Sequence, residues 1–263
     1  MQRKPFAIVA TILMLVMTAL TGCATDSDMA EHDEAYEALY VPSEDYYISD
    51  HLMQTYEDLS AVWVSFFEDQ NLEYPSITPV FVMPGQSVEN PCDMSSVIES
   101  YSYDVSTCQD TEGNFTITLP MLAFREIWDG NAFGGRLSVY SSMSADVVFA
   151  HEFAHAVVNG YGNQLYDAGE TIPAINGINN ELIADCFAGI WISTLKSRDM
   201  ISEQDIAAAI EIARVSGDDQ IEAESQAEGD DTSHGTSDER ITALKKGIDS
   251  EYTTDVCVDA YWK

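Results

Sequence analysis

Two histidines and a glutamate lie close together near the middle of the chain, as His151, Glu152 and His155. A helix turns by about 100° per residue, so side chains four positions apart share one face. The two imidazoles can therefore bind one ion, while Glu152 can reach a water molecule beside that ion. In catalytic zinc sites of this HExxH type, the ion lowers the pKa of the water and a carboxylate takes its proton. The spacing predicts Zn²⁺ bound by His151 and His155, with Glu152 as the catalytic base.

A catalytic zinc site of this kind needs a third protein ligand. The metzincin pattern would place glycine at position 158 and histidine at position 161, where this chain has Val158 and Tyr161. The gluzincin pattern instead uses a glutamate on a following helix, which Glu181 provides. Asp185 follows one turn later and is expected to accept a hydrogen bond from a zinc-binding histidine. Both acids stand in an otherwise apolar segment, where carboxylates need partners.

Four segments, in this order, resemble the bacterial family of neutral zinc metallopeptidases. They are residues 151–155 (HEFAH), 181–189 (ELIADCFAG), 217–221 (GDDQI) and 234–237 (HGTS), the last followed by Arg240. The resemblance covers roughly residues 75–260. It implies an α+β, zincin-like fold with a mainly helical active-site region and a small β-sheet. It also implies metal ligands His151, His155 and Glu181.

The resemblance leaves two roles open for His234. Its imidazole could stabilise the oxyanion of a tetrahedral intermediate, or it could cap or brace the last helix. Arg240 is expected to pair with an acid. The chain departs from the family pattern after Cys108, where it reads QDTE, and at residues 221–233, which are unusually acidic. These differences concern the substrate cleft more than the zinc site.

The first 23 residues have the features of a bacterial lipoprotein signal peptide. Arg3 and Lys4 precede a short apolar run, which ends in the lipobox-like sequence LTGC at Cys23. We expect Cys23 to carry lipid, including palmitate, and to anchor the chain to a membrane. The rest of the chain would then lie outside the cytoplasm. The alternative is an uncleaved N-terminal anchor. Residues 24–48 are then expected to be a tether and lead-in, and residues 49–263 the zinc metallopeptidase domain.

Four further cysteines fit an exported protein, because thiols in an oxidising compartment form disulfides. Three pairings of Cys92, Cys108, Cys186 and Cys257 are possible. Cys92–Cys108 would close a short loop, and Cys186–Cys257 would tie the C-terminal segment to the middle of the chain. Zinc bound by cysteines is disfavoured because the chain has no CxxC pair.

Several helices and strands must position these residues. Apolar residues at three- and four-residue steps predict a helix over residues 50–70, and alternation predicts strands over 77–83 and 115–119. A third short strand is expected between these two. Capping and apolar patterns predict the other helices over residues 121–128, 144–159, 179–196, 203–215 and 236–248. Ser144 and Asp146 would begin the HExxH helix and Gly160 would end it, with loops over 130–135, 160–177 and 216–233.

The overall charge excludes one class of partner. The 263 residues carry 45 acidic and 11 basic side chains, a formal net charge of -34. Such a surface repels nucleic acid, so we expect no nucleic-acid partner. The expected peptide or protein substrate follows from the predicted zinc peptidase site and not from the charge. Two other functions remain open: a non-catalytic zinc-binding surface lipoprotein or binding module, and cation binding by the acidic residues 218–231. The acidic segment lacks the regular ligand spacing of a calcium loop.

Overall fold

The computed structural model describes residues 43–103, 105–170, 172–175, 177–220 and 234–262. The predicted signal peptide, Cys23 and most of the tether therefore lie outside the described residues. Residues 221–233, in the predicted acidic loop, also lie outside them. The described part contains helices and small sheets, which confirms the α+β class. Its helices are α2 (Ser43–Asp69), α3 (Met121–Trp128), α4 (Ala132–Gly135), α5 (Ser142–Asp167), α6 (Ile178–Ser197), α7 (Glu203–Val215), α8 (Ser237–Ile248) and α9 (Asp255–Tyr261).

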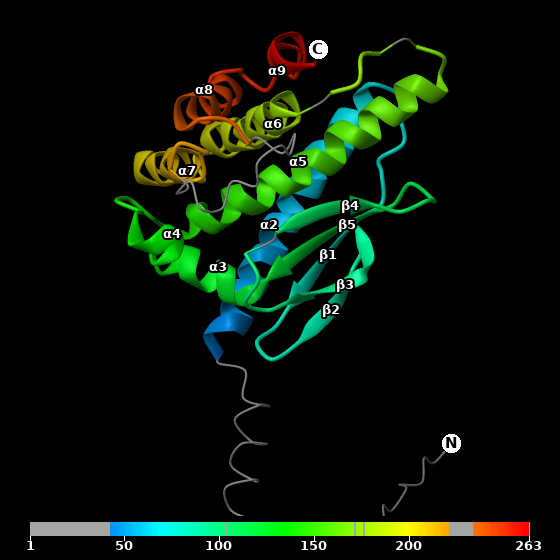
Figure 1. Cartoon of the computed structure of the whole chain (residues 1–263). Coiled ribbons are helices and arrows are strands. Elements are labelled where there is room, and N and C mark those ends of the chain that lie inside the picture. Colours follow the sequence, from blue (N-terminus) through cyan, green and yellow to red (C-terminus); the bar gives the residue numbers. More distant parts are fainter. Residues whose placement is uncertain (1–42, 104, 171, 176, 221–233, 263) are drawn as a thin grey trace, which may run out of the picture. The chain divides into compact units, whose positions relative to one another are not determined.

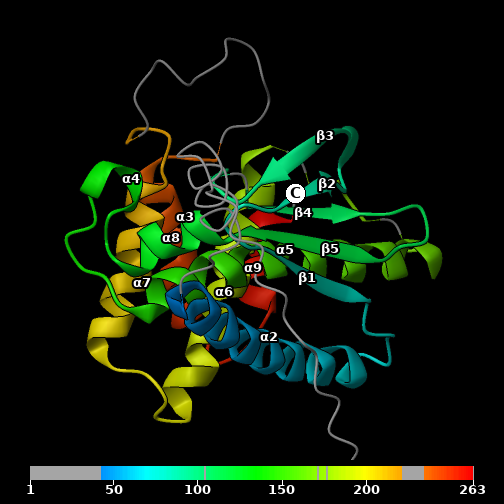
Figure 2. The same cartoon turned by 90° about the horizontal axis from the view of Figure 1, so that it is seen from below.

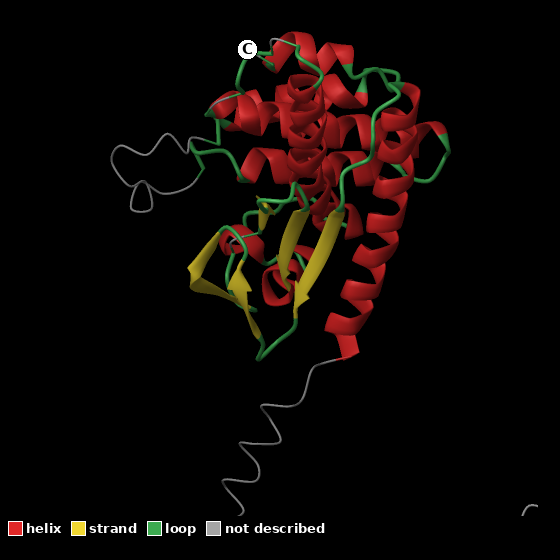
Figure 3. Cartoon of the chain, turned by 90° about the vertical axis from the view of Figure 1, so that its right-hand side faces the viewer, coloured by secondary structure: helices red, strands yellow, loops and turns green. Residues whose placement is uncertain are grey.

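Helix α5 carries the HExxH sequence and lies between two layers. Helices α6, α7, α8 and α9 lie on one side of it, and the strands lie on the other (Figures 1 and 3). Helix α2 packs against α3 and α5, and Figure 2 shows it running beside the sheet. The hydroxyl of Tyr56 on α2 donates to the carbonyl oxygen of Ile77 at 2.8 Å, which ties this helix to the first strand.

The main sheet has three strands in the order β1-β5-β4. Strand β1 (Ile77–Val82) runs parallel to β5 (Phe115–Pro120), and β4 (Ser106–Gln109) runs antiparallel to β5 at the edge. Strands β2 (Ser87–Asn90) and β3 (Asp93–Glu99) form a separate hairpin. The predicted strands at both ends of this region are confirmed, but three strands lie between them where one was expected. The edge strand β4 packs against α5.

The prediction for the start of α2 was wrong. The helix begins at Ser43, so the last six residues of the predicted lead-in, 43–48, are helical. Ile48 is completely buried and extends the apolar face of the helix by one turn. Asp45 is also buried, where its carboxylate accepts hydrogen bonds from the Arg125 guanidinium of α3.

Both predicted ends of α5 were wrong. Ser141 is the N-cap, and Ser144 is the third helical residue, completing a capping box with it. Asp146 is buried rather than placed at the helix terminus, and it binds His51 and Thr55. Gly160 does not end the helix: a Cβ there would come within 2.8 Å of the Pro75 ring, so the glycine serves close packing. The helix continues to Asp167.

Helix α8 lies very close to α6. A Cβ on Gly189 would meet the backbone of α8, and a Cβ on Gly247 would meet the backbone of α6. The small residues allow this approach, which brings α8 side chains to the acids of α6. Helix α7 has the predicted bounds, whereas the short helix α9 was not predicted, and residues 132–135 form α4 where a loop was expected.

Two disulfides join Cys92 to Cys108 and Cys186 to Cys257. The first links β4 to the hairpin region, and the second joins α6 to α9. The disulfide prediction is therefore confirmed, with one of the three possible pairings. Among the described residues, no helix is both long enough and apolar enough to cross a membrane.

Candidate metal centre

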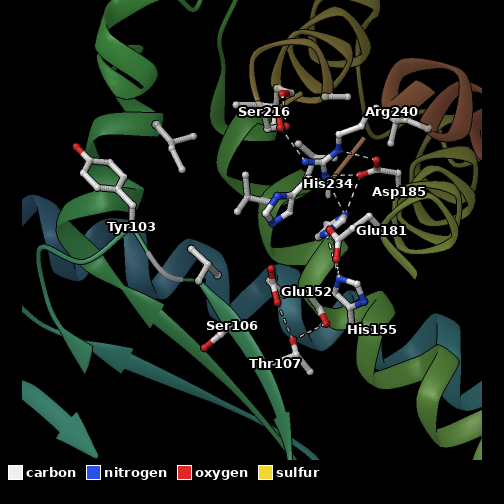
Figure 4. A pocket seen from close by; sticks show the side chains of 18 of the residues that line it. Tyr103, Ser106, Thr107, Glu152, His155, Glu181, Asp185, Ser216, His234 and Arg240 are labelled. Carbon is white, nitrogen blue, oxygen red and sulfur yellow. Dashed lines mark hydrogen bonds and ion pairs between the residues drawn. The ribbon is translucent and has the colours of Figure 1, made fainter. Parts of the chain in front are cut away.

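Three potential metal-binding atoms from α5 and α6 converge on one point (Figure 4). The Nε2 atoms of His151 and His155 lie 3.2 Å apart. Glu181 places Oε2 3.2 Å from Nε2 of His151, and Oε1 3.5 Å from Nε2 of His155. All three side chains are largely buried, and their ligand atoms lie within 4.8 Å of one another.

These separations fit a tetrahedral zinc ion. Zinc–nitrogen and zinc–oxygen bonds of about 2.0–2.2 Å place neighbouring tetrahedral ligands roughly 3.3–3.6 Å apart. Two imidazole nitrogens that face each other and a carboxylate form a donor set that a cation would complete. The residues present therefore fit the Zn²⁺ predicted from the spacing, and three protein ligands would leave a fourth position for water or substrate.

The electrostatic surroundings favour a positive charge between these side chains. Burial lowers the pKa of His155 to about 4 and so favours the neutral imidazole that binds metals. Burial alone would raise the pKa of Glu181, but the hydrogen bond and charge of His151 lower it to about 2. Burial lowers the pKa of His151, yet Asp185 and Glu181 raise it to about 10. Glu181 is thus held ionised and ready to act as a ligand.

Asp185 lies behind His151, on the side away from Glu181. Its Oδ1 atom is 2.8 Å from Nδ1 of His151, so the ionised carboxylate accepts the Nδ1–H. Nε2 is then the ring nitrogen that would bind a metal, after losing its own proton. Arg240 on α8 donates to both oxygens of Asp185, each at 2.8 Å, and is itself buried. Burial would raise the pKa of Asp185, but Arg240 and His151 hold it well below its usual range. The structure thus pairs Arg240 with an acid.

Glu152 lies beside the metal ligands on α5, with its side chain toward β4. Thr107 on that strand places its hydroxyl 2.9 Å from Oε2 of Glu152. Burial raises the pKa of Glu152 to about 7, although the charge of His151 and the Thr107 hydrogen bond oppose this shift. A carboxyl group with a pKa near neutrality can both accept and return a proton.

A cavity of about 510 Å³ opens onto these groups. Glu152, His155 and Glu181 line it, and Tyr103 lies at its far side in Figure 4. Its other walls are mainly apolar and include Ala123, Ile127, Ala132, Phe133, Val147, Val148, Ile212, Ala213 and Leu244. A concave, mostly apolar site with a few polar groups at one end is the usual form of a small-molecule or peptide-binding site.

His234 also lines this cavity but is not among the three converging ligands. Its side chain is 51% exposed, and its Nδ1 atom is 3.6 Å from Oδ1 of Asp218. The N-cap of α8 is Thr236, whose hydroxyl accepts the backbone N–H of Glu239. Thr236 rather than His234 therefore caps α8, so the capping prediction is wrong. Bracing of that helix by His234 and a role toward substrate at the cavity both stay open.

Thr107 is a site residue that the sequence patterns did not indicate. It is 45 positions before Glu152, in a short strand that had no clear alternation. The one feature of the sequence that could have indicated Thr107 is its place next to Cys108, whose disulfide holds the strand.

Comparison with known proteins agrees with this geometry. A family model described as "Putative neutral zinc metallopeptidase" matches residues 5–258. The uncharacterised protein YpfJ of Escherichia coli K12 is 32% identical over 124 residues, which cover 44% of this chain and 43% of YpfJ. The uncharacterised protein Rv2575 of Mycobacterium tuberculosis is 35% identical over 88 residues, covering 29% of this chain and 30% of Rv2575. The chain thus matches less than half the length of these relatives, and no solved structure matches it.

Proposed function

The chain belongs to the family described as putative neutral zinc metallopeptidases, and from this premise we propose that it is a zinc-dependent peptidase acting outside the cytoplasm. One observation carries the proposal. The metal-binding atoms of His151, His155 and Glu181 converge beside Glu152, at one end of an apolar cavity. A metal site that served only to brace the fold would need neither a neighbouring carboxylate nor an open cavity.

Zinc bound by these three residues would polarise a substrate carbonyl and lower the pKa of a water molecule. Glu152 is proposed to take the proton of that water and to pass it to the leaving amine. Its pKa of about 7 suits both steps. Asp185 would hold His151 in the tautomer that presents Nε2 to the ion.

The remaining groups of the cavity are proposed to bind and orient the peptide. The apolar walls would exclude water from the reacting bond. His234 is proposed to donate a hydrogen bond to the oxyanion that forms when the carbonyl is attacked. Its exposure at the cavity would allow its ring to move toward a bound substrate.

The place of action is part of the same proposal. The lipobox-like sequence ending at Cys23 supports a lipid anchor at a membrane. The two disulfides agree with an oxidising compartment outside the cytoplasm. The substrate would then be a peptide or protein of the cell envelope or its surroundings.

Hydrolysis of a quenched fluorescent peptide library tests this function. The purified chain, loaded with zinc, is expected to cleave part of the library. A chelator should abolish cleavage, and added zinc should restore it. One bound zinc per chain without chelator-sensitive cleavage would reject a peptidase and favour the non-catalytic zinc-binding lipoprotein.

A further inference from the structure

The hydroxyl of Thr107 contacts two different oxygen atoms of Glu152. It lies 2.9 Å from the carboxylate oxygen Oε2 and 2.7 Å from the backbone carbonyl oxygen of the same residue. Figure 4 draws both contacts, and shows the second carboxylate oxygen directed away from Thr107. Both oxygens are acceptors and the hydroxyl has one proton, so Thr107 shares that proton between the base and the tip of Glu152.

The position of Thr107 is itself closely fixed. Strand β4 pairs with β5, and Thr107 is in register with Ile117. The next residue, Cys108, is buried and bonded to Cys92. Threonine is also stiff about χ1, because two heavy atoms branch from its Cβ. The hydroxyl is thus held in place before any substrate arrives.

Glu152 needs such a restraint more than its neighbours do. His151, His155 and Glu181 converge on one point, where a metal ion would hold them. Glu152 does not belong to that set, and its side chain has three rotatable bonds. Every hydrogen bond found for its side chain among the described residues is to Thr107. Without this contact, the carboxylate could turn within the cavity.

We propose that Thr107 is a positioning residue for Glu152 in the proposed peptidase reaction. Its hydroxyl holds Oε2 and leaves the other carboxylate oxygen directed toward the water that loses its proton. The inference rests on the proposed function of Glu152 as the base. It assigns to β4 a part in the chemistry, in addition to its place in the sheet. Thr107 acts through Glu152 and does not itself touch the reacting atoms.

Three substitutions in the full chain test this role. Thr107→Val keeps the shape of the side chain and removes the hydroxyl, whereas Thr107→Ser keeps the hydroxyl. Thr118→Val is the matched control, because Thr118 is buried in the adjacent strand β5 and its Oγ1 atom has no hydrogen-bond partner within the part of the chain that the structure describes. Zinc content and melting temperature are measured for each protein, to show that the site is loaded and folded.

With the quenched peptide library, Thr107→Val is expected to lower kcat about tenfold, the scale of one lost hydrogen bond to a charged group. KM should stay within about twofold, because Thr107 positions the base rather than the substrate. Thr107→Ser should recover most of the lost turnover, and Thr118→Val should leave kcat unchanged. Unchanged kcat in a folded, zinc-loaded Thr107→Val protein would overturn the proposal, as would equal losses in the valine and serine variants.

A second measurement keeps this inference separate from the peptidase proposal. Crystal structures of the zinc-loaded proteins should show one Glu152 orientation in the parent and in Thr107→Ser, and several in Thr107→Val. A single unchanged orientation in Thr107→Val would refute the positioning role. If the parent chain cleaves nothing, the peptidase proposal fails, yet these structures still decide whether Thr107 orients Glu152.

Discussion

The ring nitrogen Nδ1 of His151 donates to Oδ1 of Asp185 over 2.8 Å, from one helix to the next. The same carboxylate accepts hydrogen bonds from two nitrogen atoms of Arg240 on α8. A metal ligand on α5 is therefore held by an acid on α6, which is held in turn by a base on α8. The close approach of α6 and α8 at Gly189 and Gly247 makes this relay possible.

Replacing Asp185 by asparagine tests the relay. Asp185→Asn keeps the shape of the side chain but removes the charge that orients and polarises His151. Zinc affinity should fall about 10- to 100-fold, as for other residues that support a metal-binding histidine. Stability should also fall by about 3 kcal/mol or more, because Arg240 would remain buried without its counter-charge. Competition with a chromophoric chelator measures the first effect, and urea unfolding measures the second.

Asp58 offers a matched control for that variant. It also pairs with an arginine, Arg198, and accepts the indole N–H of Trp191 on α6, but it does not contact the metal ligands. Asp58→Asn should lower stability modestly and leave zinc affinity unchanged. Equal zinc affinities for Asp185→Asn and Asp58→Asn would contradict the role given to Asp185.

A second prediction concerns the stability of the fold as a function of pH. His51 on α2 binds the buried carboxylate of Asp146 on α5, with Nε2 2.9 Å from Oδ1. This hydrogen bond raises the pKa of His51 in the folded chain, although partial burial opposes the shift. The pair therefore stabilises the fold fully below the unfolded pKa, near pH 6.5. That contribution is lost as the pH rises through the higher folded pKa.

Urea unfolding of the parent chain and of His51→Gln, both stripped of metal, measures this effect between about pH 5.5 and 9. The difference in unfolding free energy should be largest at the acidic end, on the order of 1 kcal/mol, and should shrink as the pH rises. A difference that stays constant over this range would show that protonated His51 is not what stabilises the contact.

The two disulfides should contribute to different properties. Cys186–Cys257 spans 71 residues and Cys92–Cys108 spans 16, so loop entropy predicts losses of about 4 and 3 kcal/mol when each pair is replaced by alanine. The first pair should mainly affect stability, because it attaches α9. The second should also lower kcat, because it fixes the strand that carries Thr107. Urea unfolding and turnover are measured for both variants at equal zinc content. Loss of turnover in the Cys186–Cys257 variant alone would contradict the role given to Cys92–Cys108.

Much of the candidate metal centre could be predicted because its information is local. His151 and His155 are one helical turn apart, and so are Glu181 and Asp185, so periodicity alone places each pair on one face. The segment from Glu181 to Trp191 is apolar apart from these acids, which indicates that they have buried partners. The structure places all four side chains together, as expected from the spacing.

The remainder depends on contacts that no local pattern contains. Thr107 meets Glu152 only because β4 pairs with β5 and packs on α5, and strand order cannot be read from short segments. His51 meets Asp146 across 95 positions, so Asp146 looked like an ordinary charge near a helix start. Gly160 resembled a helix end, but its lack of a side chain makes room for Pro75. In each case the role of the residue is set by a tertiary contact and not by its neighbours in sequence.

The most direct test of the central claim is the zinc content and peptidase activity of Glu152→Gln, measured on the same preparation. Glutamine keeps the size of the side chain but cannot take a proton from water. The proposed function predicts one zinc ion per chain, as in the parent, with hydrolysis of the peptide library reduced by at least about a hundredfold. Hydrolysis that persists near the parental rate in the zinc-loaded variant would contradict the assignment of Glu152 as the base.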